Sequence, residues 1–366
     1  MKHLFIINPA AGSWDHTKQY TAAIVESCNA RGLDYRVEVS KAPGECRRIT
    51  REAGETGEEY RVYACGGDGT LNEVASGAAG FPNLAITAYS GGSGNDFVRL
   101  FSEPAAFSDL ERLLDAKEVT FDMIRCNDDY ALNICSVGLD ARIGTDVARY
   151  KRLPLLQGFR AYVASTVVNV VRGIAEHYVV EICGETVDAQ QTMICVCNGR
   201  FYGGGFNPVP EADPTDGLLD VLLVKKVSRL QVSSIIGKYK NGRYKDYPDV
   251  IRHFRTDSVK ILCDKPTAIN LDGELKKGAG AFEIKSIKCG TRVNIVPNLA
   301  TAMLNISAAQ CKELLAKTGD LAKALEVAPG ETEGECLLTA HGTASHAAMP
   351  ENGVNAAGTL CMALDA

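Results

Sequence analysis

The chain has 366 residues, which is enough for two domains that each bury a sizeable core. A hydrophobic fraction of 46% and a charged fraction of 23% are those of a soluble globular protein, and the net charge of −6 argues against a general nucleic-acid binder. The 13 cysteines include no C-x-x-C pair and lie mostly in apolar runs, so we expect reduced core residues of a cytosolic protein rather than disulfides or a zinc site.

The chain begins with a predicted buried strand. Residues 4–7 are continuously apolar, which is typical of a strand covered on both faces. No signal peptide precedes this strand and no apolar run of about 18 residues occurs, so we expect neither secretion nor a membrane span. The strand ends in the small-residue turn Asn8-Pro9-Ala10-Ala11-Gly12, and a helix is predicted over about residues 17–31.

Three further strands, each followed by a turn or helix, are predicted before residue 122. In order, these are a strand at residues 35–39 that stops at Ser40, a helix at about 44–53, a strand at 60–64, a helix from Leu71, a strand at 84–88 and a helix resuming at Phe97. Repeated strand–turn–helix units predict a parallel sheet, whose ligands lie beyond the carboxyl ends of its strands. The turns at Asn8, Gly66 and Gly91 all follow such ends, so we expect them to line one crevice.

The most informative stretch is the turn Gly66-Gly67-Asp68-Gly69-Thr70-Leu71-Asn72. A glycine-rich turn between a strand and a helix exposes N–H groups at the positive end of the helix dipole, which suits a phosphate. Asp68 adds a carboxylate where a nucleotide's metal ion or the waters of that ion would lie. An ordinary tight turn is the alternative, but the Thr70 and Asn72-Glu73 that follow favour phosphate binding.

After Asp122 the pattern changes to short β-like runs separated by turn signals. These runs lie at residues 130–135, 178–183, 191–197, 218–224, 259–263 and 282–287. One long helical segment, at about residues 144–175, interrupts them. The pattern predicts an antiparallel sandwich that forms a second domain.

Two features of this second half carry chemistry. A glycine-rich loop at residues 203–205 precedes Asp213 and Asp216, which suits a hard cation held by carboxylates and carbonyls, with a surface Asp-Gly turn as the alternative. In Asp272-Gly273-Glu274, two carboxylates flank a glycine just past a strand. A type I′ hairpin turn explains that second pattern as well as a functional role does.

Together these motifs resemble the diacylglycerol-kinase-type lipid kinases, in particular the soluble bacterial branch related to sphingosine kinase. The motifs that carry the resemblance lie, in the family's order, at residues 8–12, 66–73, 92–97, 202–205, 216–220 and 272–274, and the match covers about residues 1–298. The resemblance implies an α/β fold with a phosphofructokinase-like, doubly wound nucleotide-binding catalytic domain at residues 1–122, completed by about residues 291–298. It implies an antiparallel β-sandwich lipid domain at residues 123–290.

The resemblance also implies the roles of individual residues. Contacts with ATP fall to Asn8, Pro9, Ala10, Ala11, Gly12, Ser40, Gly66, Gly67, Asp68, Gly69, Thr70, Leu71, Asn72 and Ser93. A Mg²⁺ site corresponds to Asp213, Asp216 and the carbonyl of Leu218, and Glu274 corresponds to the proton acceptor. From the residues alone, Asp68 could serve instead as the base or as the organiser of the catalytic metal's waters.

The implied activity is that of an ATP- and Mg²⁺-dependent lipid kinase, which transfers the γ-phosphate to a hydroxyl of diacylglycerol or a related lipid and feeds phospholipid metabolism. One alternative is a kinase of a soluble acceptor, because NAD kinases share a Gly-Gly-Asp-Gly-Thr turn. The Gly-Asn-Asp, Gly-Gly-Gly and Asp-Gly-Glu motifs favour the lipid branch. A catalytically inactive lipid-binding regulatory module is the other alternative, against which the intact Asp68, Asp216 and Glu274 argue.

Basic residues cluster in the second half of the chain. One set is Lys225, Lys226, Arg229, Lys238, Lys240, Arg243, Lys245, Arg252 and Arg255, and another is Arg142, Arg149, Lys151, Arg152, Arg160 and Arg172. Facing an anionic bilayer, each charge could contribute up to ~1 kcal/mol, although a solvated helical face is the alternative. We therefore expect a cytoplasmic protein, peripheral at the inner membrane face, with a lipid substrate and no nucleic-acid partner; a homodimer is left open.

The last part of the chain differs from the rest. Residues 341–356 resemble a segment of the dimerisation domain of di-zinc dipeptidases, and that resemblance covers about residues 300–366. The metal-ligand portions of that family are absent, and two histidines cannot supply a two-metal cage. We predict that residues 299–366 are a fused fragment or a gene-model artefact without peptidase activity. Because half a domain has an incomplete core, we expect loose packing or disorder there.

Overall fold

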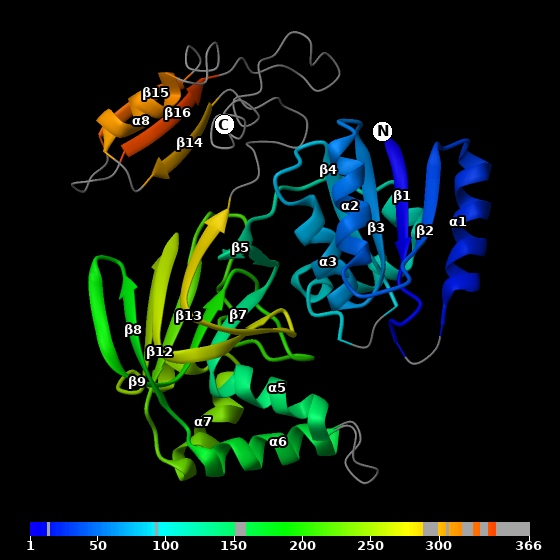
Figure 1. The fold of residues 1–366 in the computed structure, drawn as a ribbon. Helices are drawn as coiled ribbons and strands as arrows, with labels where there is room; N and C mark the ends of the chain where they lie inside the picture. Colours follow the sequence, from blue (N-terminus) through cyan, green and yellow to red (C-terminus); the bar gives the residue numbers. More distant parts are fainter. Residues whose placement is uncertain are drawn as a thin grey trace. The chain divides into compact units, whose positions relative to one another are not determined.

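The computed structural model describes residues 1–12, 15–91, 94–150, 159–287, 299–304, 307–316, 325–329 and 336–341. Met1–Cys289 form one compact unit and Gly290–Ala366 form another. The first unit contains two sheets, a parallel one near the N-terminus and an antiparallel one that begins at Met123 (Figure 1). None of the helices in the described part of the chain has both the length and the apolar character needed to cross a bilayer.

The parallel sheet is covered on both faces by helices. Its strands are β1 (Lys2–Ile7), β2 (Tyr35–Val39), β3 (Tyr60–Gly66) and β4 (Leu84–Ser90), in the order β2-β1-β3-β4, and its first helices are α1 (Thr17–Arg31), α2 (Glu45–Glu55) and α3 (Asp68–Ala78). Along β1 the side chains alternate between the faces, as the pleat of a strand requires. Phe5 and Ile7 pack with Ile24 of α1, whereas Leu4 and Ile6 pack with residues of α2 and α3.

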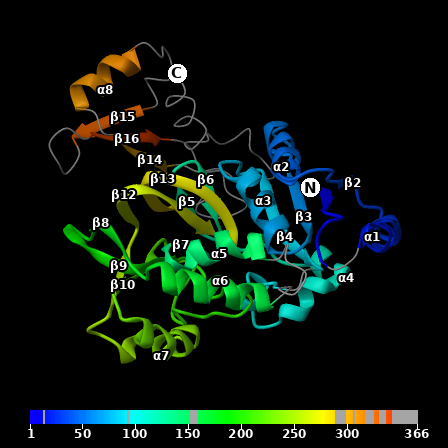
Figure 2. The ribbon, with the colours of Figure 1, turned by 60° about the horizontal axis from the view of Figure 1, so that its bottom comes forward.

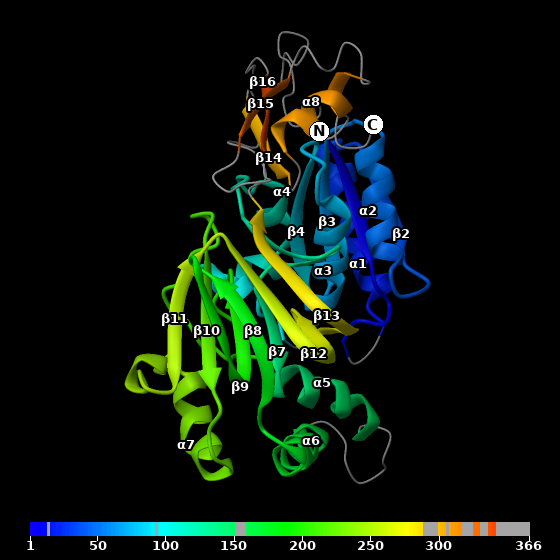
Figure 3. The same cartoon turned by 60° about the vertical axis from the view of Figure 1, so that its left-hand side comes forward.

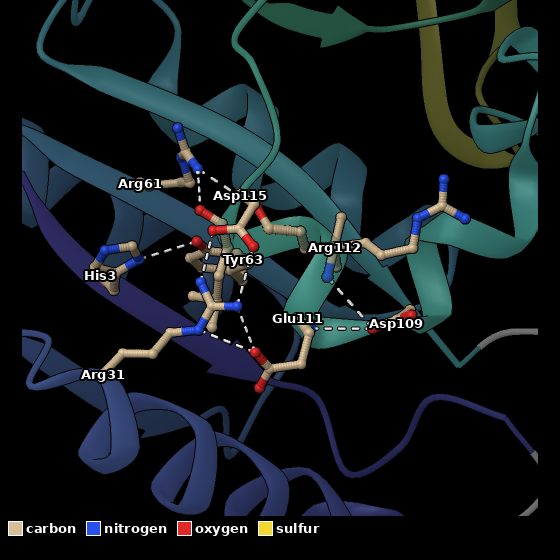
Figure 4. Close-up of polar contacts among 10 residues, drawn as sticks. His3, Arg31, Arg61, Tyr63, Asp109, Glu111, Arg112 and Asp115 are labelled. Atoms are coloured by element: carbon tan, nitrogen blue, oxygen red, sulfur yellow. Dashed lines mark hydrogen bonds and ion pairs between the residues drawn. The ribbon is translucent and has the colours of Figure 1, made fainter.

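A polar cluster attaches the short helix α4 (Leu110–Leu114) at the amino ends of the strands (Figure 4). Arg31, the last residue of α1, donates to Glu111 at 2.9 Å and to Asp115 at 2.6 Å. Arg61 of β3 donates to the carbonyl of Leu114 at 3.1 Å, which satisfies an acceptor at the end of α4. These contacts hold α4 against the parallel sheet, at the end of the sheet opposite the glycine-rich turns.

The helix predicted to resume at Phe97 is not continuous. The structure has the 3-10 helices η1 (Val98–Leu100) and η2 (Pro104–Ser108) there, followed by α4. The backbone leaves the helical region at Phe101, and Pro104, which disfavours a helical conformation at the residue before it, begins η2.

The second sheet has nine strands and antiparallel pairing throughout its described ladders. The strands are β5 (Met123–Cys126), β6 (Asp129–Ala131), β7 (Ile134–Gly138), β8 (Glu176–Ile182), β9 (Glu185–Cys197), β10 (Leu219–Lys225), β11 (Ile251–Thr256), β12 (Ser258–Leu271) and β13 (Glu274–Ile287). The single strand predicted at residues 130–135 is divided between β6 and β7. It is divided because the N–H groups of Leu132 and Asn133 bind the carboxylate of Asp272 instead of a neighbouring strand.

The described residues of this second lobe form three α-helices and the short 3-10 helix η3 (Tyr244–Asp246). The helical segment predicted at residues 144–175 consists of α5 (Leu139–Tyr150) and α6 (Phe159–Arg172), which lie side by side (Figure 2). The third helix, α7 (Arg229–Lys240), was not predicted. Its start carries a recognisable signal, because Ser228 and Gln231 form a reciprocal capping box.

The described part of the second unit forms a small sheet with one helix. Its described elements are β14 (Leu299–Leu304), α8 (Ala308–Leu315), β15 (Leu325–Pro329) and β16 (Cys336–His341), with the antiparallel strand order β14-β16-β15. Cys311 of α8 packs with Cys336 and Leu338 of β16 in a small core. In these residues α8 packs on the sheet. The expectation of loose packing or disorder for residues 299–366 stays a prediction, since most of that range lies outside the described residues. The strand predicted at residues 291–298 lies outside the described residues.

One ionic contact at the edge of the second lobe yields a prediction about pH. His177 of β8 lies between Asp264 of β12, at 3.0 Å from its Nδ1, and Asp188 of β9, at 2.7 Å from its Nε2. The hydrogen bonds from Asp264 and then Asp188 raise the pKa of His177 above its usual value.

We expect the contribution of His177 to folding stability to fall as the pH rises. The stabilisation is fully present below the ordinary histidine pKa of about 6.5 and is lost as the pH passes through the raised pKa of the folded state. Thermal melts of the wild type and His177→Gln between about pH 5 and pH 9 measure this effect. The difference in Tm should be largest at the acidic end, and a difference independent of pH would contradict the prediction.

Candidate functional site

Three turns meet at the carboxyl ends of the parallel strands. Asn8, which follows β1, donates from Nδ2 to Oγ1 of Thr70 at 3.0 Å. Gly91, which follows β4, donates its N–H to the carbonyl of Gly66 at the end of β3, also at 3.0 Å. The structure thus brings together the three turns that the sequence places after strand ends.

Gly66 is required by lack of space. A Cβ atom at this position would lie 2.4 Å from Oγ1 of Thr70 and 3.2 Å from Cβ of Ala11. Both distances are shorter than ordinary van der Waals contacts, so a side chain at position 66 would push Thr70 and Ala11 away from it. The glycine lets the two turns approach each other and keeps the backbone open to a ligand.

The helix that follows has no side-chain cap at its N-terminus. Gly67 occupies the N-cap position of α3 and provides no side chain to accept a hydrogen bond from the first turn. The free N–H groups and the helix dipole both favour an anion here. A small pocket opens at this point, with Gly66, Gly67, Asp68, Ser90 and Asn95 among its lining residues.

Asp68, in the first turn of α3, is oriented by the loop that follows β4. Its Oδ1 accepts hydrogen bonds from the N–H groups of Asp96 at 2.8 Å and Phe97 at 3.4 Å. The residue is half-buried, and the pocket reaches it. The carboxylate is therefore held in a fixed orientation beside the turn that is suited to phosphate.

Asp96 connects this loop to the second lobe. Its Oδ2 accepts the N–H of Gly204 at 2.8 Å, and its Oδ1 lies 3.7 Å from Nε of Arg99. Burial raises the pKa of Asp96; the Gly204 N–H opposes that rise, and the negative charge of Asp68 adds to it. The sequence motif Gly94-Asn95-Asp96 included this residue, but we assigned it no role.

Asp272 forms a second connection between the lobes. It accepts hydrogen bonds from the N–H groups of Leu132, Asn133 and Ile134 at 2.5, 3.0 and 2.8 Å, and from Nδ2 of Asn72 at 3.3 Å. Burial of the carboxyl group raises the pKa of Asp272 to about 6, although the N–H donors oppose the rise. Asn72 also donates to a backbone carbonyl of the second lobe, so α3 is bound directly to the sandwich.

Glu274 begins β13 and comes close to the phosphate turn. Its Oε1 lies 2.9 Å from the position that a Cβ atom would occupy on Gly69. Asp272 and Gly273, between β12 and β13, both have positive φ angles, of 51° and 93°, as a type I′ hairpin requires. The two explanations of this motif are therefore compatible, because the hairpin turn is what delivers the Glu274 carboxylate to the first lobe.

The predicted metal residues lie in one turn before β10. Asp213 accepts two hydrogen bonds from Thr215, at 3.0 Å from its N–H and 2.7 Å from its hydroxyl. Asp216 accepts the N–H of Leu218 at 2.8 Å and pairs with Arg255. The donor set of two carboxylates and a carbonyl is chemically suited to Mg²⁺, but Arg255 competes for Asp216. Across the described residues, no cluster of three or more His, Cys, Asp or Glu side chains forms a metal cage.

The remaining predicted contacts are placed as follows. Ser40 is buried at the end of β2 and donates its N–H to the carbonyl of Ile7 at 2.9 Å, so it adjoins the first turn. The Ala10 N–H binds Oδ1 of Asn8 at 3.0 Å within that turn. Leu71 packs in the core and also lines the small pocket beside the turn. Ser93 lies outside the described residues.

Two family models match the chain. Residues 2–126 match the diacylglycerol kinase catalytic domain, and residues 133–297 match the YegS C-terminal NAD kinase beta sandwich-like domain. The matched segments correspond to the parallel sheet with its helices and to the antiparallel sheet. The second segment ends at residue 297, shortly after the start of the second unit at Gly290, and neither segment covers the rest of that unit.

Relatives and solved structures agree with these matches. A "putative lipid kinase" of Staphylococcus carnosus (strain TM300) is 27% identical over 260 residues, which are 70% of this chain and 84% of that protein. "Putative lipid kinase SaurJH9_0749" of Staphylococcus aureus (strain JH9) is 26% identical over 65% of this chain and 74% of its own. A crystal structure of a "putative diacylglycerol kinase" from Bacillus anthracis str. Sterne has a TM-score of 0.61 at 22% identity, over 78% of this chain and 94% of that one.

The predicted fold class, an α/β lobe followed by an antiparallel β-rich lobe, is confirmed by this likeness. Membership of a kinase family implies a phosphotransferase that uses ATP, as kinases do with a divalent metal. Through residues 2–126 and 133–297, the chain belongs to the diacylglycerol-kinase-type family of lipid kinases.

Proposed function

We propose that this protein transfers the γ-phosphate of ATP to a hydroxyl group of diacylglycerol or a related lipid. The family supports a kinase, and one geometric observation carries the assignment of the site. A carboxylate from the second lobe, Glu274, lies against Gly69 in the phosphate-binding turn of the first lobe. An acceptor hydroxyl bound beside this contact would meet a base from one lobe and a phosphate held by the other.

Phosphoryl transfer depends mostly on positioning and on neutralising charge. Backbone N–H groups around Gly66 and Gly67, together with the N-terminus of α3, bind the phosphates. Glu274 accepts the proton of the attacking hydroxyl. Asp68, held by the N–H groups of Asp96 and Phe97, faces the same pocket and would hold a divalent cation directly or through water.

Mg²⁺ would supply positive charge beside the phosphates when it is bound. A second Mg²⁺ at Asp213, Asp216 and the Leu218 carbonyl would need Arg255 to leave Asp216, so its binding is coupled to that ion pair. The same turn contacts the segment between the lobes, because Gly217 donates its N–H to Oδ2 of Asp122 at 2.6 Å.

A second candidate function is a kinase of a soluble acceptor. The specific observation in its favour is that the family model for residues 133–297 is described as NAD kinase beta sandwich-like. A catalytically inactive lipid-binding module is the third candidate. The three candidates differ in which acceptor, if any, receives phosphate.

The deciding experiment is phosphate transfer from labelled ATP by the full chain in the presence of Mg²⁺. The acceptors are diacylglycerol and a sphingoid base in mixed micelles, and NAD in solution. We expect label on a lipid, with none on NAD. Label on NAD alone would support the soluble-acceptor enzyme, and label on no acceptor would support the inactive module.

Asp68→Asn should lower kcat more than tenfold while the fold remains intact. The amide keeps an oxygen for the N–H groups of Asp96 and Phe97, but it removes the charge that faces the pocket. Asp34→Asn, at an exposed turn before β2, makes the same charge change at the opposite end of the sheet and should leave kcat unaltered. A variant at Asp68 that retains over about a tenth of wild-type kcat, a barrier increase below ~1.4 kcal/mol, would rule out the proposed role.

Glu274→Gln should lower kcat by about 10²–10⁴-fold, because an amide cannot accept the proton of the hydroxyl. The Kd for ATP, measured by calorimetry, should stay within error of the wild-type value. Glu283→Gln, further along the same strand, is the matched control and should behave as the wild type. If Glu274→Gln weakens only ATP binding, Glu274 belongs to the metal or nucleotide contacts and Asp68 is the better candidate for the base.

A further inference from the structure

The end of α6 and the start of α7 lie against each other at one end of the second lobe (Figures 1 and 3). Arg229, the first residue of α7, donates from Nε to the carbonyl of Val170 at 3.0 Å and from Nη2 to the carbonyl of Val171 at 2.7 Å. These bonds satisfy acceptors at the C-terminal end of α6 and hold the two helices together.

The same junction exposes two large aliphatic residues. The side chain of Val171 is 62% exposed and that of Leu230 is 85% exposed, although most large apolar residues of the described chain are buried. The two residues are neighbours, because Arg229 binds the Val171 carbonyl and directly precedes Leu230. Ile236, further along α7, is also exposed.

Cationic residues lie next to Leu230 in the sequence. Residues 225–245 contain seven Lys and Arg residues and no Asp or Glu, in a chain whose net charge is −6. Of these seven, Lys238 and Arg243 pair with Asp246 and Lys245 pairs with Glu211, so the cations relevant to this surface are Lys225, Lys226 and Arg229. Lys225 and Lys226 are exposed, and their side chains donate to neutral oxygens, the Asp249 carbonyl at 3.1 Å and Oε1 of Gln190 at 2.7 Å. The bonds of Arg229 likewise end on backbone carbonyls rather than on carboxylates.

We propose that this surface, the α6–α7 patch of Val171, Leu230, Lys225, Lys226 and Arg229, docks the protein on a bilayer that contains anionic lipid. Exposed aliphatic side chains enter the boundary between head groups and acyl chains, and the cations bind the anionic head groups. Reversible attachment to a membrane requires both kinds of contact, and the patch presents both. A second copy that met this patch across a two-fold axis would place like charges opposite each other, so the patch favours an anionic lipid surface over a symmetric dimer.

The patch is connected to the proposed catalytic residue through packed helices. Asp146 of α5 pairs with Arg172 of α6 at 2.8 Å, and Ser165 of α6 donates to the Ile143 carbonyl at 2.7 Å. A Cβ atom on Gly144 of α5 would lie 3.2 Å from the side chain of Leu275, the neighbour of Glu274. The inference rests on the proposed function in this respect, because docking here would bring a lipid acceptor to the lobe that carries the base.

The test is co-sedimentation of the full chain with two kinds of vesicle. One contains phosphatidylcholine alone, and the other contains phosphatidylcholine with about 30% phosphatidylglycerol. We expect binding to the anionic vesicles that weakens as salt is added. Leu230→Ser should weaken the partition by about threefold or more. Lys226→Glu should weaken it by at least about fivefold.

The chain offers a matched pair of controls. Val119 is 61% exposed and Lys117 is exposed nearby, both in the segment that follows α4. Val119→Ser and Lys117→Glu make similar changes in apolar surface and the same change in charge at a different surface. Both controls should bind the anionic vesicles as the wild type does.

Several outcomes would overturn the proposal. One is a wild-type chain that fails to bind the anionic vesicles, and another is equal binding by the patch variants and the controls. If Leu230→Ser instead converts a dimer to a monomer in ultracentrifugation while vesicle binding is unchanged, the patch is a surface for self-association. Kinase assays separate this inference from the proposed function. If the chain binds vesicles but phosphorylates no lipid, the docking proposal holds and the proposed function fails. If the chain is a lipid kinase but its patch variants bind vesicles normally, the proposed function holds and the docking proposal fails.

Discussion

The geometry of the candidate site depends on one carboxylate, that of Asp272. Three consecutive N–H groups of the second lobe and the amide of Asn72 in the first lobe all converge on it. Hydrogen bonds are directional, so this arrangement fixes the position of the β12–β13 turn relative to α3 more narrowly than apolar packing would. Loss of the carboxylate would leave several N–H donors without a partner, at a cost of ~1–3 kcal/mol for each buried one. Glu274 lies two residues further on and takes its position from this anchor.

A second carboxylate contact acts in the same direction. Asp96 accepts the Gly204 N–H of the second lobe, and its own N–H binds Asp68. One chain of hydrogen bonds therefore joins Asp68 in the phosphate turn, Asp96 in the loop after β4 and Gly204 in the glycine-rich loop of the second lobe. Burial and the negative charge of Asp68 both raise the pKa of Asp96. A cation bound near these two carboxylates would reduce the repulsion between them. The negative charges thus favour a cation in the same pocket in which the N–H groups favour an anion.

Much of the first lobe could be predicted from the sequence, because its strands are short apolar runs and its turns consist of glycine and other small residues. The contacts that depend on residues far apart in the chain could not. Asp272 and Asp96 belong to motifs identified in the sequence. No local pattern shows that each carboxylate accepts a hydrogen bond from the other lobe. The division of β6 from β7 follows from the same long-range bond to Asp272, and a propensity for strand at residues 130–135 cannot reveal it. The packing of α8 on β16 in the second unit was not predicted, because it joins residues that are far apart in the chain. Helix α7 was missed despite a capping box that identifies its start.

The close approach of Glu274 to Gly69 has a consequence for how this protein can vary. The absence of a side chain at position 69 and the length of the side chain at position 274 are two halves of one steric requirement, although they lie on different lobes. Alanine at position 69 would displace the carboxylate end of Glu274, which is the tip of a flexible side chain and can move at little cost to folding. The substitution would therefore act on the position of the proposed base rather than on the stability of the fold. Glycine at position 69 leaves the Glu274 carboxylate free to lie against the turn.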